Sequence, residues 1–325
     1  MNAPLRLHDA HARLVALQSF LQARLIGCSV LVERLLVALL TGGHVLIEGP
    51  PGLAKTRAVK LLAQGLAAPF ARVQCTPDLM PADITGTPVW RPDRGVFEFV
   101  AGPVFHSLVL VDEINRAPPK VQSALLEAMA ELQVTAGGVT HRLPDPFMVV
   151  ATQNPIEQEG TFPLPEAQLD RFLAHVVVAL PDPAGERQIL DLVQTEASGM
   201  DGGQAPALSL ADVAAARAGV RAVHLSPAIR DYIVRLVTAP RVAGVAPELA
   251  RLIAHPASPR GTLSLASAAQ ARAWLHGRDH ATPDDVRALA PDILAHRTIP
   301  TWKATAEGET ARGLITRYLA RILPL

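Results

Sequence analysis

The sequence predicts an α/β fold with three layers around a parallel sheet, followed by an all-α domain. Two observations support this prediction. Short apolar segments alternate with helical patterns over roughly the first half of the chain, which is typical of a parallel sheet covered by helices on both faces. Beyond Pro181 the chain is rich in Ala, Leu and Arg and has few segments of strand character. We therefore expect residues 1–181 to form the α/β domain and residues 182–325 the helical domain.

Five apolar segments are expected to form the strands of the sheet. They are residues 44–48, 70–75, 107–113, 147–152 and 176–180. A helical pattern covers residues 10–40, where Leu14, Leu17, Leu21 and Leu25 repeat on one face. Further helices are expected over residues 56–65 and after Pro118. The strands therefore alternate with helices, as a parallel sheet requires.

Two segments depart from this alternation. Residues 76–104 are rich in Pro, Gly and Asp and are expected to form an elaborated surface insertion. Residues 132–142 have a Gly137-Gly138 pair at their centre, which predicts a β-hairpin.

The segment between the first strand and its helix has the pattern of a phosphate-binding loop. It consists of Gly49, Pro50, Pro51, Gly52, Leu53, Ala54, Lys55 and Thr56. Such a loop points backbone N–H groups at a polyphosphate, and the following helix N-terminus adds partial positive charge. We expect Lys55 to reach the β- and γ-phosphates and the Thr56 hydroxyl to bind Mg²⁺.

Ala54 stands where this pattern usually has a glycine. Because glycine is needed only where φ is positive or the backbone passes very close to a ligand, we predict a negative φ at Ala54. A positive φ there would count against the phosphate-loop interpretation. The alternative is an ordinary turn between strand and helix with a solvated lysine.

Two later strands end in polar residues. Asp112 and Glu113 end the third strand, and Asn154 follows the fourth. Ligands of open α/β sheets bind at the carboxyl edge, so Asp112 is expected to orient Mg²⁺ and Glu113 to act as general base. If the two strands are neighbours, Asn154 could hold the same water or the γ-phosphate. The alternatives are solvated acids at a strand end and a turn-capping asparagine.

Two arginines are further candidates. An arginine can stabilise the charge that develops during phosphoryl transfer. Arg171 could do so, but nothing in the local sequence shows it, and the local sequence favours an ion pair with Asp170 or Glu166. Arg260 precedes a long helix in the second domain, and its alternative role is that of a solvated arginine at a helix start.

Composition excludes several classes of function. Thirty basic and thirty acidic residues give a net charge of zero, which offers no bulk attraction for nucleic acid or an anionic membrane. Two cysteines make no disulfide framework, the first residues lack the apolar core of a signal peptide, and no segment is expected to span a membrane. We therefore expect a cytoplasmic protein. Motifs for hydrolytic triads and for structural zinc are absent.

Five segments together resemble the MoxR-type AAA+ ATPases, of the helix-2-insert branch, over nearly the whole chain. They are GPPGLAKT at 49–56, VDEINRA at 111–117, ATQNP at 151–155, EGTFPLPEAQLDRF at 159–172 and SPRG at 258–261. The resemblance implies an AAA+ core followed by an α-helical lid. It also implies that the insertion at 76–104 is the helix-2 insert and that the Gly137-Gly138 hairpin precedes sensor 1.

The resemblance also assigns roles to single residues. Asp112 and Glu113 would form Walker B, and Asn154 would be sensor 1. Arg171 would be an arginine finger acting on the neighbouring subunit's ATP, and Arg260 would be sensor 2. Ile26 and Gly27 occupy the stretch expected near the adenine, where Cys28 replaces the amide residue that is common in the family.

The implied activity is Mg²⁺-dependent ATP hydrolysis by a hexameric ring that remodels, matures or activates a partner complex. A von Willebrand factor A-domain protein and a client protein are the implied partners. Two alternatives stay open, namely a nucleotide-gated scaffold with little turnover and a motor subunit of a metal chelatase or nucleic-acid machine. Zero net charge weighs against the nucleic-acid machine.

Overall fold

The computed structural model describes residues 3–155, 160–198, 205–242 and 246–324, with side chains from residue 9 onward. The chain divides into two compact units. The first contains Met1–Leu164 and Val176–Val213, and the second contains Pro165–His175 and Ala214–Leu325. This division differs from the predicted boundary at Pro181, because residues 165–175 group with the helical part and residues 182–213 with the sheet.

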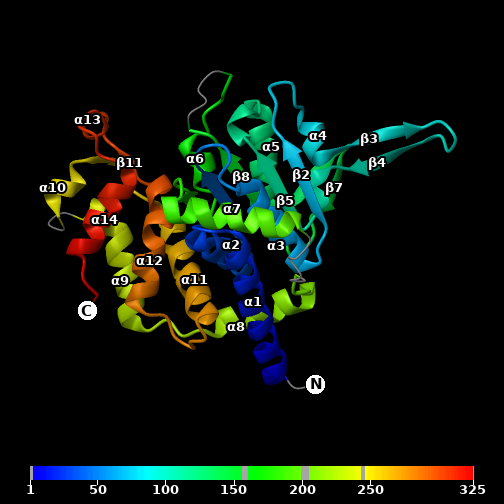
Figure 1. Cartoon of the computed structure of the whole chain (residues 1–325). Helices are drawn as coiled ribbons and strands as arrows, with labels where there is room; N and C mark the ends of the chain where they lie inside the picture. Colours follow the sequence, from blue (N-terminus) through cyan, green and yellow to red (C-terminus); the bar gives the residue numbers. More distant parts are fainter. Residues whose placement is uncertain (1–2, 156–159, 199–204, 243–245, 325) are drawn as a thin grey trace. The chain divides into compact units, whose positions relative to one another are not determined.

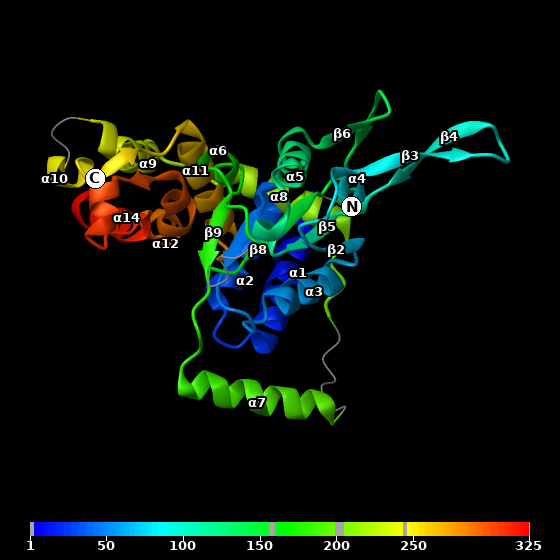
Figure 2. The same cartoon turned by 90° about the horizontal axis from the view of Figure 1, so that it is seen from above.

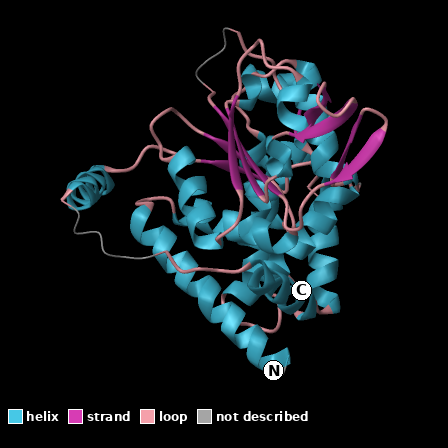
Figure 3. Cartoon of the chain, turned by 90° about the vertical axis from the view of Figure 1, so that its right-hand side faces the viewer, coloured by secondary structure: helices cyan, strands magenta, loops and turns pink. Residues whose placement is uncertain are grey.

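A five-stranded sheet forms the centre of the first unit (Figures 1 and 3), in the order β2-β5-β8-β1-β9. The strands are β1 (Val45–Glu48), β2 (Phe70–Gln74), β5 (Leu108–Asp112), β8 (Met148–Gln153) and β9 (Ala174–Val177). The pairs β1–β8, β2–β5 and β5–β8 are parallel, which confirms the predicted sheet. Strand β5 is buried along its whole length, since its residues are apolar up to the final aspartate.

Helices cover this sheet on both faces, as Figure 3 shows with helices in cyan around magenta strands. They include α1 (Ala3–Arg24), α2 (Ser29–Thr41), α3 (Lys55–Leu66) and α5 (Pro119–Glu131). The predicted leucine face of α1 is buried, and its Leu17 packs so closely on α3 that a Cβ at Gly65 would lie 2.2 Å from it. The single helix predicted over residues 10–40 is two helices, because Gly27 adopts a φ of +74° between them.

The insertion contains a helix and a β-hairpin that extends away from the sheet (Figures 1 and 2). Its elements are α4 (Pro81–Thr85), β3 (Gly86–Arg91), β4 (Val96–Ala101) and η1 (Pro103–Phe105). The predicted second hairpin is also present, as β6 (Gln133–Ala136) and β7 (Val139–Arg142). The two hairpins touch where the ring of Phe99 stacks on His141 with centroids 3.9 Å apart.

The second unit is mainly helical, as predicted, with one small antiparallel pair, β10 (Ile253–His255) and β11 (Ile299–Pro300). Its helices include α6 (Glu166–Leu169), α9 (Pro227–Thr238), α11 (Pro259–Leu275), α12 (Pro283–Leu294), η4 (Ala295–Arg297) and α14 (Ala311–Arg321). Helix α7 (Pro183–Ala197) belongs to the first unit, and α8 (Leu210–Ala222) begins in the first unit and continues into the second. Within the described residues, no helix combines the length and the apolar character needed to cross a bilayer.

His44 fixes the start of β1 through two backbone contacts. Its Nδ1 accepts a hydrogen bond from the Val149 N–H at 3.0 Å, so its Nε2 carries the proton and donates to the Met129 carbonyl at 3.2 Å. Burial lowers the pKa of His44 from 6.5 to about 4. The neutral ring is therefore the form that the fold requires.

This linkage predicts a pH-dependent contribution to stability. Between pH 6.5 and about 4 the unfolded chain binds a proton at His44 that the folded chain does not, so stability falls as the pH drops through this window. At about 1.4 kcal/mol per pKa unit, the loss by pH 4 is on the order of 3 kcal/mol. His44→Asn keeps an acceptor near Nδ1 but does not titrate. Urea unfolding of both proteins from pH 7.5 to 4 should show the advantage of wild type shrinking, and parallel stability profiles would contradict the assignment.

Candidate functional site

The loop between β1 and α3 depends on two glycines. A Cβ at Gly49 would lie 2.7 Å from the Val178 carbonyl oxygen, a distance that no larger residue can adopt. Gly52 has a φ of +86°, which glycine adopts without strain. Lys55 opens α3, and its Nζ donates to the Gly49 carbonyl at 2.6 Å. The lysine ammonium and the helix N-terminus therefore bring positive charge to the same loop.

The prediction of a negative φ at Ala54 is wrong. Its φ is +52° and its ψ is 17°, in the left-handed region. The conformation is imposed from outside the residue, since the Ala54 carbonyl must accept the first helical bond, from the Ala58 N–H at 2.8 Å, while the chain turns out of the loop. Ala54 thus counts against the phosphate-loop interpretation, which rests instead on Lys55, Thr56 and the acidic residues opposite them.

Relief of this strain can be measured. A left-handed conformation costs a non-glycine residue roughly 1–2 kcal/mol, and glycine removes this cost. Glycine also makes the unfolded chain more flexible, which lowers the free energy of unfolding by about 0.4–1 kcal/mol. Ala54→Gly should therefore raise the free energy of unfolding by about 0.5–1 kcal/mol. Ala58→Gly, one turn later in the interior of α3, is the control and should lower it by about 1 kcal/mol. Denaturant titration that finds both substitutions equally destabilising would contradict the strain at Ala54.

Asp112 ends β5, and its carboxylate accepts hydrogen bonds from three neighbouring segments. Its Oδ1 accepts from the Thr152 hydroxyl at 2.6 Å, and its Oδ2 accepts from the Thr56 hydroxyl at 3.2 Å and from Arg72 at 2.7 Å. Burial alone would raise the pKa of Asp112, but the hydrogen bonds from Thr152 and Arg72 lower it below its usual value. The carboxylate is therefore ionised at neutral pH although it is only 8% exposed.

Glu113 lies directly beyond the strand in a strained conformation. Its φ of +57° and ψ of 55° are unfavourable for a glutamate and persist only where neighbours enforce them. Its N–H donates to the Thr152 hydroxyl at 2.9 Å. Its Oε2 accepts from Gln74 at 3.0 Å and from Arg116 at 3.3 Å. The carboxylate is therefore held at the carboxyl edge of the sheet.

Asn154 lies at the same edge, because β8 pairs in parallel with both β5 and β1. It is buried at 5% exposure and follows Gln153, whose carbonyl accepts a hydrogen bond from Lys55 at 3.4 Å. The role considered for Asn154 required the two strands to be neighbours, and β5 and β8 are paired in the sheet. Lys55, Thr56, Asp112, Glu113 and Asn154 all belong to segments that meet at this edge.

A pocket of about 730 Å³ lies beside the loop. Its lining combines Gly52, Leu53, Ala54, Lys55 and Thr56 with side chains of α1 and α3. Phe20 and Arg24 contribute from α1, with the guanidinium 4.1 Å from the ring centroid. Ile26 and Gly27, expected near the adenine, are not among the lining residues of this pocket.

The donor set fits the nucleotide and metal that the sequence predicts. A hydroxyl and an ionised carboxylate 3.2 Å apart are the hard oxygen ligands that Mg²⁺ prefers. A lysine at a helix N-terminus suits a polyphosphate. Within the described residues, no group of three or more His, Cys, Asp or Glu side chains could hold a metal ion by itself.

Sequence reasoning missed three contributors, Arg72, Gln74 and Thr152. Arg72 and Gln74 lie on β2, which pairs with β5 so that Gln74 is opposite Asp112. Thr152 lies on β8, on the other side of β5. Arg72 is a charged residue inside a predicted strand, which indicates that it has a polar partner. That the partner is Asp112 follows only from the strand order.

The two candidate arginines belong to the second unit. Arg171 is half-buried and follows α6, and Arg260 lies in the first turn of α11. Arg260 is 3.3 Å from Asp170 Oδ2, so the carboxylate that we considered for Arg171 pairs with Arg260 and also with Arg297. Residue 159, which begins the fourth matching segment, lies outside the described residues.

The fold and this edge of the sheet together define a P-loop ATPase. Residues 44–174 match the model of the ATPase family associated with various cellular activities (AAA), and residues 245–317 match that of the AAA lid domain.

Similar proteins identify the family within the AAA ATPases. The chain is 44% identical to Chaperone MoxR1 of Mycobacterium tuberculosis over 302 residues, covering 92% of this chain and 78% of that protein. It is 37% identical to Protein MoxR of Paracoccus denitrificans over 310 residues, covering 90% of each. A crystal structure from Cytophaga hutchinsonii, provisionally described as an ATPase, has a TM-score of 0.89 and 39% identity and covers 99% of this chain and 98% of that one. The chain belongs to the MoxR-type AAA+ ATPases and is a chaperone-like ATPase.

Proposed function

We propose that this ATPase binds Mg²⁺ and ATP at the loop of residues 49–56 and hydrolyses ATP to remodel, mature or activate a partner protein complex. The observation that carries the proposal is the pairing of the Thr56 hydroxyl with the ionised Asp112 carboxylate at 3.2 Å, beside Lys55. The names of the relatives, which include a chaperone, support the choice of protein complexes as clients.

Each residue at the edge has a distinct role in this proposal. Lys55 donates to a carbonyl of its own loop and would turn to the terminal phosphates. Thr56 and Asp112 would hold Mg²⁺, which when bound neutralises charge on the phosphate oxygens. Glu113, whose carboxylate is oriented by Gln74 and Arg116, would take a proton from the attacking water, and Asn154 would orient that water.

The remaining expectations concern assembly. We propose that the chain forms a hexameric ring in which Arg171 acts on the nucleotide of the neighbouring subunit and Arg260 acts as sensor 2. Arginine suits such roles because its planar fork matches phosphate oxygens. A von Willebrand factor A-domain protein as partner and a location in the cytoplasm also remain proposals.

The first test separates nucleotide binding from chemistry. Lys55→Ala removes the charge-assisted hydrogen bonds to phosphate, worth about 1.5–3 kcal/mol each, and should weaken ATP binding at least tenfold. Glu113→Gln should bind ATP normally and lower kcat by about 10²–10⁴. Calorimetry and steady-state ATPase assays measure the two effects, and Lys120→Ala, an exposed lysine on α5, is the control. A wild-type rate no higher than that of Lys55→Ala, with ATP still bound, would favour the nucleotide-gated scaffold.

A second test concerns the shared site. Arg171→Ala should leave ATP affinity nearly unchanged and reduce kcat by about 10³ or more. The specific activity of wild type should rise with protein concentration as the ring assembles. Arg251→Ala replaces an exposed arginine of the same unit and should behave as wild type. Normal hydrolysis by Arg171→Ala, or activity independent of protein concentration, would contradict action between subunits.

A further inference from the structure

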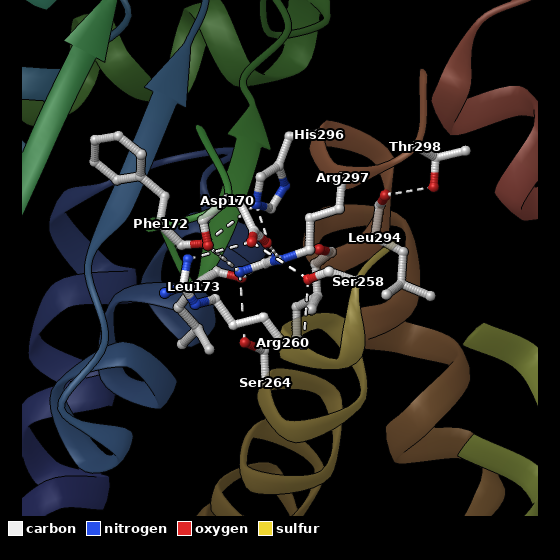
Figure 4. Close-up of polar contacts among 11 residues, drawn as sticks. Asp170, Phe172, Leu173, Ser258, Arg260, Ser264, Leu294, His296, Arg297 and Thr298 are labelled. Atoms are coloured by element: carbon white, nitrogen blue, oxygen red, sulfur yellow. Dashed lines mark hydrogen bonds and ion pairs between the residues drawn. The ribbon is translucent and has the colours of Figure 1, made fainter. Parts of the chain in front are cut away.

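A buried arginine of the second unit holds the segment that carries Arg171 (Figure 4). The side chain of Arg297, in η4, is 2% exposed. Its Nε donates to Asp170 Oδ1 at 2.7 Å. Its two terminal nitrogens donate to main-chain carbonyls of the same segment, those of Asp170 at 3.1 Å, Phe172 at 2.6 Å and Leu173 at 3.1 Å. These carbonyls lie on both sides of Arg171.

The N–H groups and the carbonyls of this segment have different partners. The N–H groups of Arg171 and Phe172 donate back into α6, to Gln168 and Leu169, both at 3.1 Å. The carbonyls instead meet the guanidinium of Arg297. Since buried carbonyls require donors, Arg297 replaces the strand or helix that would otherwise satisfy them.

Only an arginine can make this set of contacts. A guanidinium carries five donors in a rigid plane, whereas an ammonium offers three donors from a single point. His296 supports the arrangement as a neutral ring, whose Nε2 lies 2.8 Å from the guanidinium and accepts a hydrogen bond from it. Burial and the charge of Arg297 keep the pKa of His296 well below its usual value, so it adds no competing positive charge.

The other oxygen of Asp170 is held more weakly. Its Oδ2 is 3.3 Å from both the Ser258 hydroxyl and Arg260, whose side chain is 54% exposed. An exposed pair of this kind is worth at most about 1 kcal/mol. Asp170 is therefore fixed by Arg297, and Arg260 is able to leave it without disturbing that contact.

We propose that Arg297, together with Asp170, is a positioning residue for Arg171. The pair fixes the backbone on both sides of Arg171 and so sets the direction in which its side chain is presented to the neighbouring subunit. A lone structural role explains the contacts less well, because burying a charged pair usually adds little net stability compared with apolar packing. The inference rests on the proposed action of Arg171 between subunits.

Mixed oligomers test this directly. Arg297→Lys keeps the charge but loses the fork, and we expect kcat to fall at least tenfold while KM for ATP stays within about twofold, since the variant's own nucleotide site is intact. Co-assembly with Glu113→Gln, which cannot hydrolyse ATP but retains Arg171 and Arg297, should restore activity to the Arg297→Lys protomers. In a randomly mixed ring of equal amounts, about a quarter of the sites would combine an intact Glu113 with a neighbouring subunit that retains Arg171 and Arg297.

Three variants run in parallel as controls. Arg171→Ala mixed with Glu113→Gln is the positive control and should be rescued to the same extent. Asp170→Asn, which keeps the side-chain shape, should be rescued in the same way and decides the question if Arg297→Lys does not fold. Arg272→Lys alters another, partly buried pair of this unit, with Asp285 at 2.7 Å, and should retain wild-type kcat. It lies twelve residues beyond Arg260 along α11, about 18 Å away at the helical rise.

The outcomes distinguish the positioning role of Arg297 from the action of Arg171 between subunits. If Arg171→Ala is rescued but folded Arg297→Lys is not, Arg297 does not act through Arg171 and the inference fails alone. If Arg171→Ala is not rescued either, the action between subunits fails, and the inference fails with it. Rescue of both variants, with Arg272→Lys unaffected, supports the positioning role.

Discussion

The carboxylate of Asp112 is the group on which the geometry of the site depends. One oxygen accepts from Thr152 on the neighbouring strand β8, and the other accepts from Thr56 on α3. The same Thr152 hydroxyl accepts the N–H of Glu113. A single buried charge therefore aligns two central strands with the loop helix and sets the strained turn that aims Glu113.

In the second unit a positively charged side chain, Arg297, has a similar structural role. Where Asp112 gathers donors from three elements, Arg297 gathers the acceptors of one irregular segment. In both cases an irregular backbone beside a proposed functional residue is held by one ionised side chain with several fixed partners. Such satisfied polar networks define one conformation more sharply than apolar packing, which is non-directional.

The sequence was sufficient where local pattern determines the outcome. Apolar runs located the strands, and the rule that parallel strands end at one edge placed Asp112 and Asn154 at that edge. That their strands are neighbours follows only from the observed strand order. The break at Gly27 and the left-handed Ala54 were missed, because both depend on how the chain must turn between packed elements. The contacts of Arg72 and Arg297 were missed for a related reason. Their partners lie 40 and 127 residues away, and no local spacing encodes them.

The ion pair between Arg72 and Asp112 has a consequence for how a metal would enter the site. The aspartate already has an internal counterion, attached to β2 and 2.7 Å away. An incoming divalent cation would not meet a bare negative charge. It would displace the Arg72 guanidinium from Asp112. Its affinity would therefore reflect the difference between the metal–Asp112 and Arg72–Asp112 interactions, and not the full strength of the metal–Asp112 interaction. An exchange of this kind lowers the net affinity for the metal and so favours its release, which suits an ATPase that must empty its site in every cycle.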